Sequence, residues 1–133
     1  MDLQKAGLSQ SKSLQRLVDS LTFDCSISGE EVPFILKELG GIEKRDLMER
    51  LSLVAASLAS PLISKYFVGV CGEGGSGGLY LGFNEETKGE MANLADTYHG
   101  EQSMVVNAYR HGESKILSLC VNASPCGHCR QFL

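Results

Sequence analysis

The sequence lacks the long apolar runs, signal pattern and basic clusters that would place it in a membrane or on a nucleic acid. No apolar stretch approaches the roughly 18 residues that a membrane-spanning helix needs. No basic segment followed by an apolar one marks a signal peptide. No run of Lys or Arg exceeds two residues, and the net charge of the 133-residue chain is −4. Because nucleic-acid-binding proteins usually carry a basic face, neither a nucleic acid nor a membrane is an expected partner.

A disulfide framework is also not expected. The chain has five cysteines, an odd number, and no signal pattern, which together favour a reducing compartment and a cytoplasmic location. Cys71 and Cys120 fall in predicted strands, where a free cysteine is ordinary core. Cys25 lies near a predicted turn and has no evident partner. Cys126 and Cys129 have the spacing of metal ligands or of a redox pair.

Residues 1–60 have the apolar spacing of helices. Ser28 and Glu31 have the spacing of a capping box, and Gly40-Gly41 would end the helix that they open, because glycine accepts the left-handed conformation. The predicted helices cover residues 14–21, 28–39 and 47–58. We expect this small N-terminal helical region to supply core and no chemistry.

The composition changes at Pro61, where strands begin to alternate with turns. Strands are predicted at 66–70 and 79–83. The glycine-rich stretch 72–78 between them lacks the G-x-x-x-x-G-K-[ST] pattern of a phosphate loop, so it is predicted to be a hairpin connection. Residues 87–98 have no clean period and are predicted to form a loop with a helical turn.

The last part of the chain continues with two helices around one strand. The order strand, strand, helix, strand, helix predicts an α/β fold with a helical layer over a sheet. The elements are a helix over 101–110 that buries Met104, Val105 and Tyr109 and ends at Gly112, a central strand over 116–121, and a helix that starts at Cys126.

Two short motifs supply soft metal ligands and one carboxylate. His99 lies 27 residues before Cys126, and Cys129 follows after a two-residue gap. Zinc favours thiolate and imidazole ligands, and a catalytic zinc keeps three protein ligands and a water. His99, Cys126 and Cys129 are therefore the predicted ligands, at helix starts whose dipoles favour thiolates. Glu101 can lie beside the metal without binding it and is the predicted catalytic acid–base.

The segments 98–102 and 124–133 resemble those of cytidine deaminases, of the larger dimeric kind with a helical N-terminal region; H-x-E followed by P-C-x-x-C marks zinc deaminases. The resemblance implies a three-layer α/β/α core over residues 61–133, one Zn²⁺ per chain and a homodimer. It implies hydrolysis of cytidine and 2′-deoxycytidine to uridine and 2′-deoxyuridine in pyrimidine salvage. The family core continues past the position of Leu133, so an incomplete sheet and a C-terminal truncation are expected.

The resemblance also implies a nucleoside pocket. Asn84-Glu85-Glu86 matches the family's N-x-E, which binds the ribose hydroxyls, although an ordinary turn after a strand is the alternative. Tyr66 occupies the position of the aromatic residue that flanks the base, and it could equally be core. Gly100 departs from the family, which usually has alanine between the histidine and the glutamate.

Other interpretations remain open at this stage. His111-Gly112-Glu113 repeats the first triplet, and we predict a solvated turn there. His128, between the two cysteines, is predicted to point away from the metal. The chain could instead be a non-catalytic or impaired zinc-binding fragment, a deaminase of another cytosine nucleoside, or a thiol redox protein that uses Cys126 and Cys129.

Overall fold

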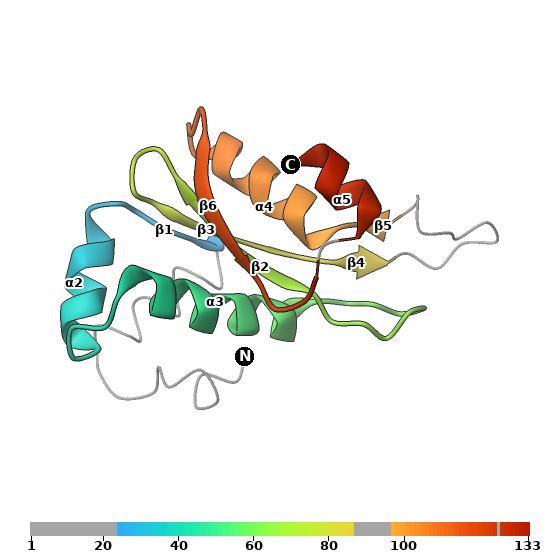
Figure 1. Cartoon of the computed structure of the whole chain (residues 1–133), viewed down its shortest axis with the longest axis horizontal. Coiled ribbons are helices and arrows are strands. Elements are labelled where there is room, and N and C mark those ends of the chain that lie inside the picture. The colour runs from blue at the N-terminus through green and yellow to red at the C-terminus, as the bar shows by residue number, and fades with distance from the viewer. Residues whose placement is uncertain (1–23, 87–96, 125) are drawn as a thin grey trace.

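The computed structural model describes residues 24–86, 97–124 and 126–133 (Figure 1). The predicted helix at 14–21 and most of the predicted loop at 87–98 lie outside these residues. The elements, in chain order, are β1 (Ser26–Ile27), α2 (Glu31–Glu38), α3 (Lys44–Leu58), β2 (Gly69–Gly74), β3 (Leu79–Phe83), β4 (Glu85–Glu86), β5 (Thr97–Tyr98), α4 (Gly100–Arg110), β6 (Ile116–Val121) and α5 (Gly127–Phe132).

The larger sheet has the strand order β1-β3-β2-β6, and every pair in it is antiparallel. Helix α3 packs on one face of this sheet, and α4 packs on the other, with α5 beside α4 (Figure 1). The described residues therefore form three layers, helix, sheet and helix, and the predicted α/β class is confirmed. A separate two-stranded sheet pairs β4 with β5.

Side chains of alternate residues in β2 serve the two faces of the sheet, as strand geometry requires. Cys71 belongs to the apolar cluster under α3, which also contains Leu47, Leu51 and Leu81. Val70, its neighbour, belongs to the cluster under α4. The prediction of Cys71 as free core is confirmed, because its thiol is unpaired and fully buried.

The local signals at the start of the described chain are confirmed. Ser28 N–H donates to Glu31 Oε2 over 3.1 Å, and Glu31 N–H donates back to Ser28 Oγ over 3.4 Å, which is the predicted capping box. Gly40 and Gly41 end α2 with φ angles of 88° and 78°, in the left-handed region. None of the described helices is long and apolar enough to cross a bilayer.

The predicted strand at 66–70 is wrong in its position, because β2 begins at Gly69. The carbonyl oxygens of Tyr66 and Phe67 accept hydrogen bonds from the side-chain amides of Asn84 and Asn122, at 2.8 and 3.0 Å, instead of entering a ladder. At the other end, β2 continues into the glycine-rich stretch as far as Gly74. The turn itself is therefore shorter than predicted.

The strand β6 is not central among the described strands, as the sequence pattern predicted, but lies at the edge of the sheet. It pairs with β2 alone, and Leu117 on it is 54% exposed. In α4, Tyr109 is also exposed, contrary to the prediction, because the buried stripe runs through Met104 and Ala108, one turn apart.

The second H-G-E triplet has a structural role and is not simply a solvated turn. Gly112 ends α4 with a φ of 89°, as its position predicted. Glu113 accepts hydrogen bonds from the backbone N–H of Ser76 at 3.1 Å, from the Ser76 hydroxyl, and from the Tyr80 hydroxyl at 2.8 Å. This carboxylate thereby ties the turn after β2 to the end of α4.

We expect Glu113→Gln to cost stability at neutral pH and much less in acid. Hydrogen bonds from Ser76 and Tyr80 hold the pKa of Glu113 below its usual value of 4.5. The stability that it contributes is therefore complete above about pH 4.5 and is lost as the pH falls through its lower folded-state pKa. Urea unfolding of both proteins at about pH 7 and about pH 3 would measure this. A difference between them that is the same at both pH values would contradict the prediction.

Candidate metal centre

His99 is held between a strand and a helix. It follows β5, which pairs with β4, and it is the N-cap of α4. Its backbone N–H donates to Gln102 Oε1 over 3.4 Å, which fixes the start of the helix. The imidazole Nδ1 lies 3.5 Å from Cys126 Sγ, although 27 residues separate the two in the sequence.

The two cysteines lie at the start of α5. Cys126 is its N-cap, and Cys126 Sγ accepts a hydrogen bond from the backbone N–H of Cys129 over 3.4 Å. Cys129 is buried and Cys126 is exposed. The side chain of His128, between them, is outside the described part of the chain, so the structure does not test its predicted orientation.

The imidazole and the two thiols fit a zinc ion. The ligand atoms of His99, Cys126 and Cys129 all lie within 4.8 Å of one another. Zinc takes nitrogen at ~2.0 Å and sulfur at ~2.3 Å in a tetrahedron, which places such atoms roughly 4 Å apart. No other group of three such residues within the described ranges has this arrangement, and His111 is not part of it.

Glu101 lies next to this cluster without belonging to it. It is only 3% exposed, in the first turn of α4, and its carboxylate hydrogen-bonds with the Cys129 side chain. Burial, together with this hydrogen bond, raises the pKa of the Cys129 thiol. A thiol in this position needs a cation to become a thiolate, and a metal ion supplies that charge.

A cavity of about 170 Å³ opens beside the cluster. Of the residues predicted to bind substrate, Tyr66, Asn84 and Glu86 line it together with His99 and Glu101. Ser64 also lines it and was not predicted, because no local pattern distinguishes a serine in an exposed turn. Val68 and Ser124 also line it, beside the metal-ligand cysteines.

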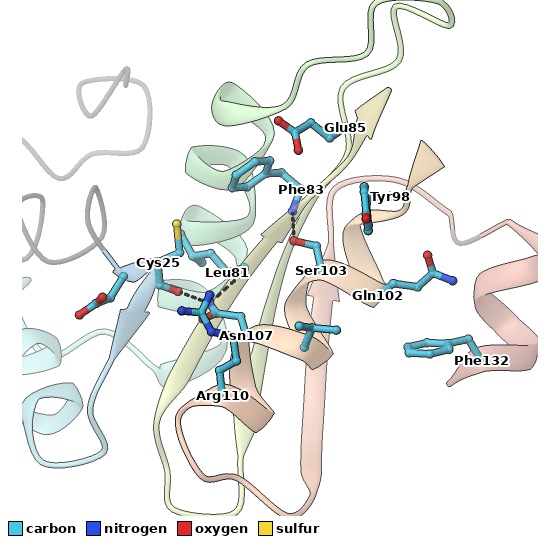
Figure 2. Close-up of a pocket in the computed structure, with 12 residues that line it drawn as sticks. Cys25, Leu81, Phe83, Glu85, Tyr98, Gln102, Ser103, Asn107, Arg110 and Phe132 are labelled. Atoms are coloured by element: carbon cyan, nitrogen blue, oxygen red, sulfur yellow. Dashed lines mark hydrogen bonds between the residues drawn. The ribbon is translucent and has the colours of Figure 1, made fainter. Parts of the chain in front are cut away.

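Glu85 lies elsewhere. Since it precedes Glu86 in β4, strand geometry points its side chain to the opposite side. It lines a second cavity of about 590 Å³, which is formed by residues of β3 and α4 together with Tyr98 and Phe132 (Figure 2). The structure thus brings together three of the four predicted substrate-binding residues and separates Glu85 from them.

Two polar side chains of this second cavity, those of Asn107 and Ser103, bind backbone groups of the fold. Asn107 Nδ2 donates to the carbonyl oxygens of Cys25 and Leu81, at 2.8 and 3.1 Å, and Ser103 Oγ accepts from Phe83 N–H at 3.4 Å (Figure 2). The first of these bonds satisfies the backbone carbonyl group of Cys25, a residue with a left-handed φ of 51°. The cavity has no cluster of metal-binding or nucleophilic groups among its described residues.

The sequence model described as the cytidine and deoxycytidylate deaminase zinc-binding region matches residues 42–133. The chain belongs to this deaminase family. It is 40% identical over 131 residues to a cytidine deaminase from Vibrio cholerae and 43% identical over 107 residues to one from Shewanella frigidimarina. These matches cover 98% and 80% of this chain but 43% and 35% of the relatives, so the chain spans less than half of their length.

Solved deaminase structures share the fold. A cytidine deaminase from Mycobacterium leprae superposes with a TM-score of 0.60 at 25% identity, over 68% of this chain and 78% of that one. A dCMP deaminase from the cyanophage S-TIM5 has a TM-score of 0.52 at 17% identity, which shows the fold alone, over 68% of this chain and 75% of that one. The family and the donor set together confirm the predicted zinc cofactor.

We expect His99→Ala to abolish zinc binding and His111→Ala to leave it intact. Both residues precede a Gly-Glu pair, but only His99 lies with the two deaminase-motif cysteines. Elemental analysis of both purified variants after dialysis against trace zinc would measure this. Zinc retained by His99→Ala and lost from His111→Ala would move the metal site to the second triplet.

Proposed function

We propose that this chain hydrolyses cytidine and 2′-deoxycytidine to uridine and 2′-deoxyuridine, with release of ammonia. The observation that carries this proposal is the buried carboxylate of Glu101 beside the cluster of His99, Cys126 and Cys129. A redox pair of cysteines needs no such carboxylate and no histidine. A structural zinc usually has four protein ligands, whereas this cluster offers three among the residues that the structure describes.

In this proposal the three ligands hold zinc, which when bound lowers the pKa of a water molecule and so supplies the nucleophile. Glu101 moves the protons. Its carboxylate takes a proton from the attacking water and delivers it to N3 of the cytosine ring. It then takes the remaining proton of the new hydroxyl group on C4 and gives it to the amino group, so that the C–N bond breaks, ammonia leaves and the C4 carbonyl of uridine forms. Because Glu101 is excluded from solvent, its protons go to the substrate rather than to bulk water.

The lining of the 170 Å³ cavity supports a nucleoside as the substrate. Its size is below the roughly 300–1,000 Å³ of typical ligand sites, which suits one heterocyclic ring. Asn84 and Glu86, on the same wall, are the proposed partners of the sugar hydroxyls. Tyr66, which is 59% exposed, would flank the base at the mouth of the cavity.

The charge of the same cavity argues against a nucleotide. Among the described residues that line it there are two carboxylates, Glu86 and Glu101, and neither lysine nor arginine. A phosphate group needs cationic or backbone N–H donors and is repelled by carboxylates. A free nucleoside is therefore the proposed substrate. A cytoplasmic homodimer that acts in pyrimidine salvage is the proposed setting, on the basis of the family resemblance.

The test is turnover on a preparation whose zinc content is known. Cytidine and 2′-deoxycytidine should lose their cytosine absorbance and release one ammonia each, whereas cytidine monophosphate should not react. Absence of turnover with about one zinc per chain would favour the non-catalytic zinc fragment. Absence of zinc, with a reversible disulfide between Cys126 and Cys129, would favour the redox protein.

A further inference from the structure

The turn segment 62–67 forms part of the wall of the metal cavity through Ser64 and Tyr66, yet little apolar burial holds it. Leu62, Ile63, Tyr66 and Phe67 are all between 44% and 59% exposed. Lys65 has a left-handed φ of 59°, which costs energy for a residue with a β-carbon. The position of this segment must therefore depend on hydrogen bonds.

Those hydrogen bonds converge on Glu86. Its carboxylate accepts from the backbone N–H groups of Ile63 and Ser64, at 2.6 and 2.8 Å, and from the Ser64 hydroxyl. The residue is 6% exposed, so the bonds lie out of competition with solvent. These donors, with the Ser64 hydroxyl as the largest contribution, lower the pKa of Glu86 and keep it ionised.

Ser64 extends this contact in a second direction. While its hydroxyl donates to Glu86 Oε1, the same oxygen accepts from the backbone N–H of Tyr66 at 3.2 Å. The Tyr66 carbonyl is in turn bound by the side chain of Asn84 at 2.8 Å. One hydroxyl thus connects the carboxylate, the aromatic residue and the amide that line the cavity.

We propose that Ser64 is a positioning residue that sets Glu86 and Tyr66 for the sugar and base of the nucleoside. This inference rests on the proposed function of the cavity. The two backbone N–H groups fill Oε2 of Glu86 and the Ser64 hydroxyl takes one position on Oε1, which leaves the second lone pair of Oε1 for a hydroxyl of the ligand. Without the Ser64 hydroxyl, Oε1 loses the hydrogen bond that fixes its direction, while the two backbone N–H groups still hold Oε2.

The experiment compares the binding of the product uridine and of its analogue 2′,3′-dideoxyuridine to the zinc-loaded chain by calorimetry. Ser64→Ala should weaken uridine binding about tenfold, as expected for a lost hydrogen bond to a charged group. It should change the binding of dideoxyuridine little, because that ligand lacks the 2′- and 3′-hydroxyls that Glu86 is proposed to bind. Ser64→Thr, which keeps the hydroxyl, should restore uridine affinity.

Ser57→Ala is the matched control, since its hydroxyl donates to the Val54 carbonyl of its own helix, at 2.6 Å, and Ser57 does not line the cavity. Equal uridine affinity in Ser64→Ala and the unaltered chain would overturn the positioning role. Equal losses for both ligands would also overturn it, because they indicate a general distortion of the wall. If uridine fails to bind the unaltered chain, the proposed function fails and this inference fails with it.

Discussion

Replacing Glu101 by glutamine is expected to lower the rate of cytidine deamination by about 10²–10⁴-fold while the chain keeps its zinc. Glutamine has nearly the same shape, so the 3%-exposed position at the start of α4 can accept it. Its amide cannot carry a proton from water to the ring. Zinc should remain, because the carboxylate of Glu101 is not part of the ligand cluster.

Two measurements on one preparation make this result specific. Elemental analysis gives zinc per chain, and absorbance gives turnover at saturating cytidine. Glu38→Gln makes the same chemical change at an exposed site on α2 and should affect neither. Loss of zinc in Glu101→Gln would make Glu101 a ligand or a support of the ligands. Full activity in that variant would remove it from the mechanism.

The metal cluster could be predicted from the sequence because each of its parts is a local signal. A histidine before a helix and two cysteines at the start of another are short motifs whose chemistry restricts them to few roles. Their convergence on one point then required only that the two helices lie on the same face of one sheet. The structure places α4 and α5 side by side on that face (Figure 1).

The support around the cluster could not be predicted, because it consists of side chains that bind distant backbone groups. The side-chain amides of Asn84 and Asn122 donate to backbone carbonyl groups that would otherwise extend the ladder of β2. The β-propensity of residues 66–70 does not indicate these bonds, because it depends only on the residues themselves. Glu113 looked like part of a solvated turn, but its partner Ser76 lies 37 residues away. Such bonds become visible only when the chain is folded.

The orientation of Glu85, in contrast, could have been predicted from the sequence. Once β4 is known to be a strand, adjacent residues must face opposite sides, so Glu85 and Glu86 cannot both face the substrate. The two-residue length of β4 hid this periodicity, because a period of two needs a longer run to be recognised.

The second large effect is expected at Gly82, where the helix that carries His99 and Glu101 rests on the sheet. A β-carbon there would lie 2.2 Å from the Gly100 carbonyl oxygen and 2.3 Å from the Met104 nitrogen, both backbone atoms of α4. Since a helix backbone cannot give way locally, Gly82→Ala must push α4 off β3. We expect a loss of roughly 1–3 kcal/mol in the free energy of unfolding, as for other overpacked sites.

The same displacement should reduce activity, because α4 begins at the metal ligand His99. Gly100→Ala is the matched control on the other side of the contact. Its β-carbon would meet the side-chain methyl groups of Val70 and Val68, at 3.0 and 3.2 Å, which can shift by a few tenths of an ångström. Urea unfolding and zinc content, measured for both variants, should therefore show large losses for Gly82→Ala and small ones for Gly100→Ala. The opposite order would mean that the metal centre depends on the backbone freedom of Gly100 and not on the close approach of α4 to the sheet.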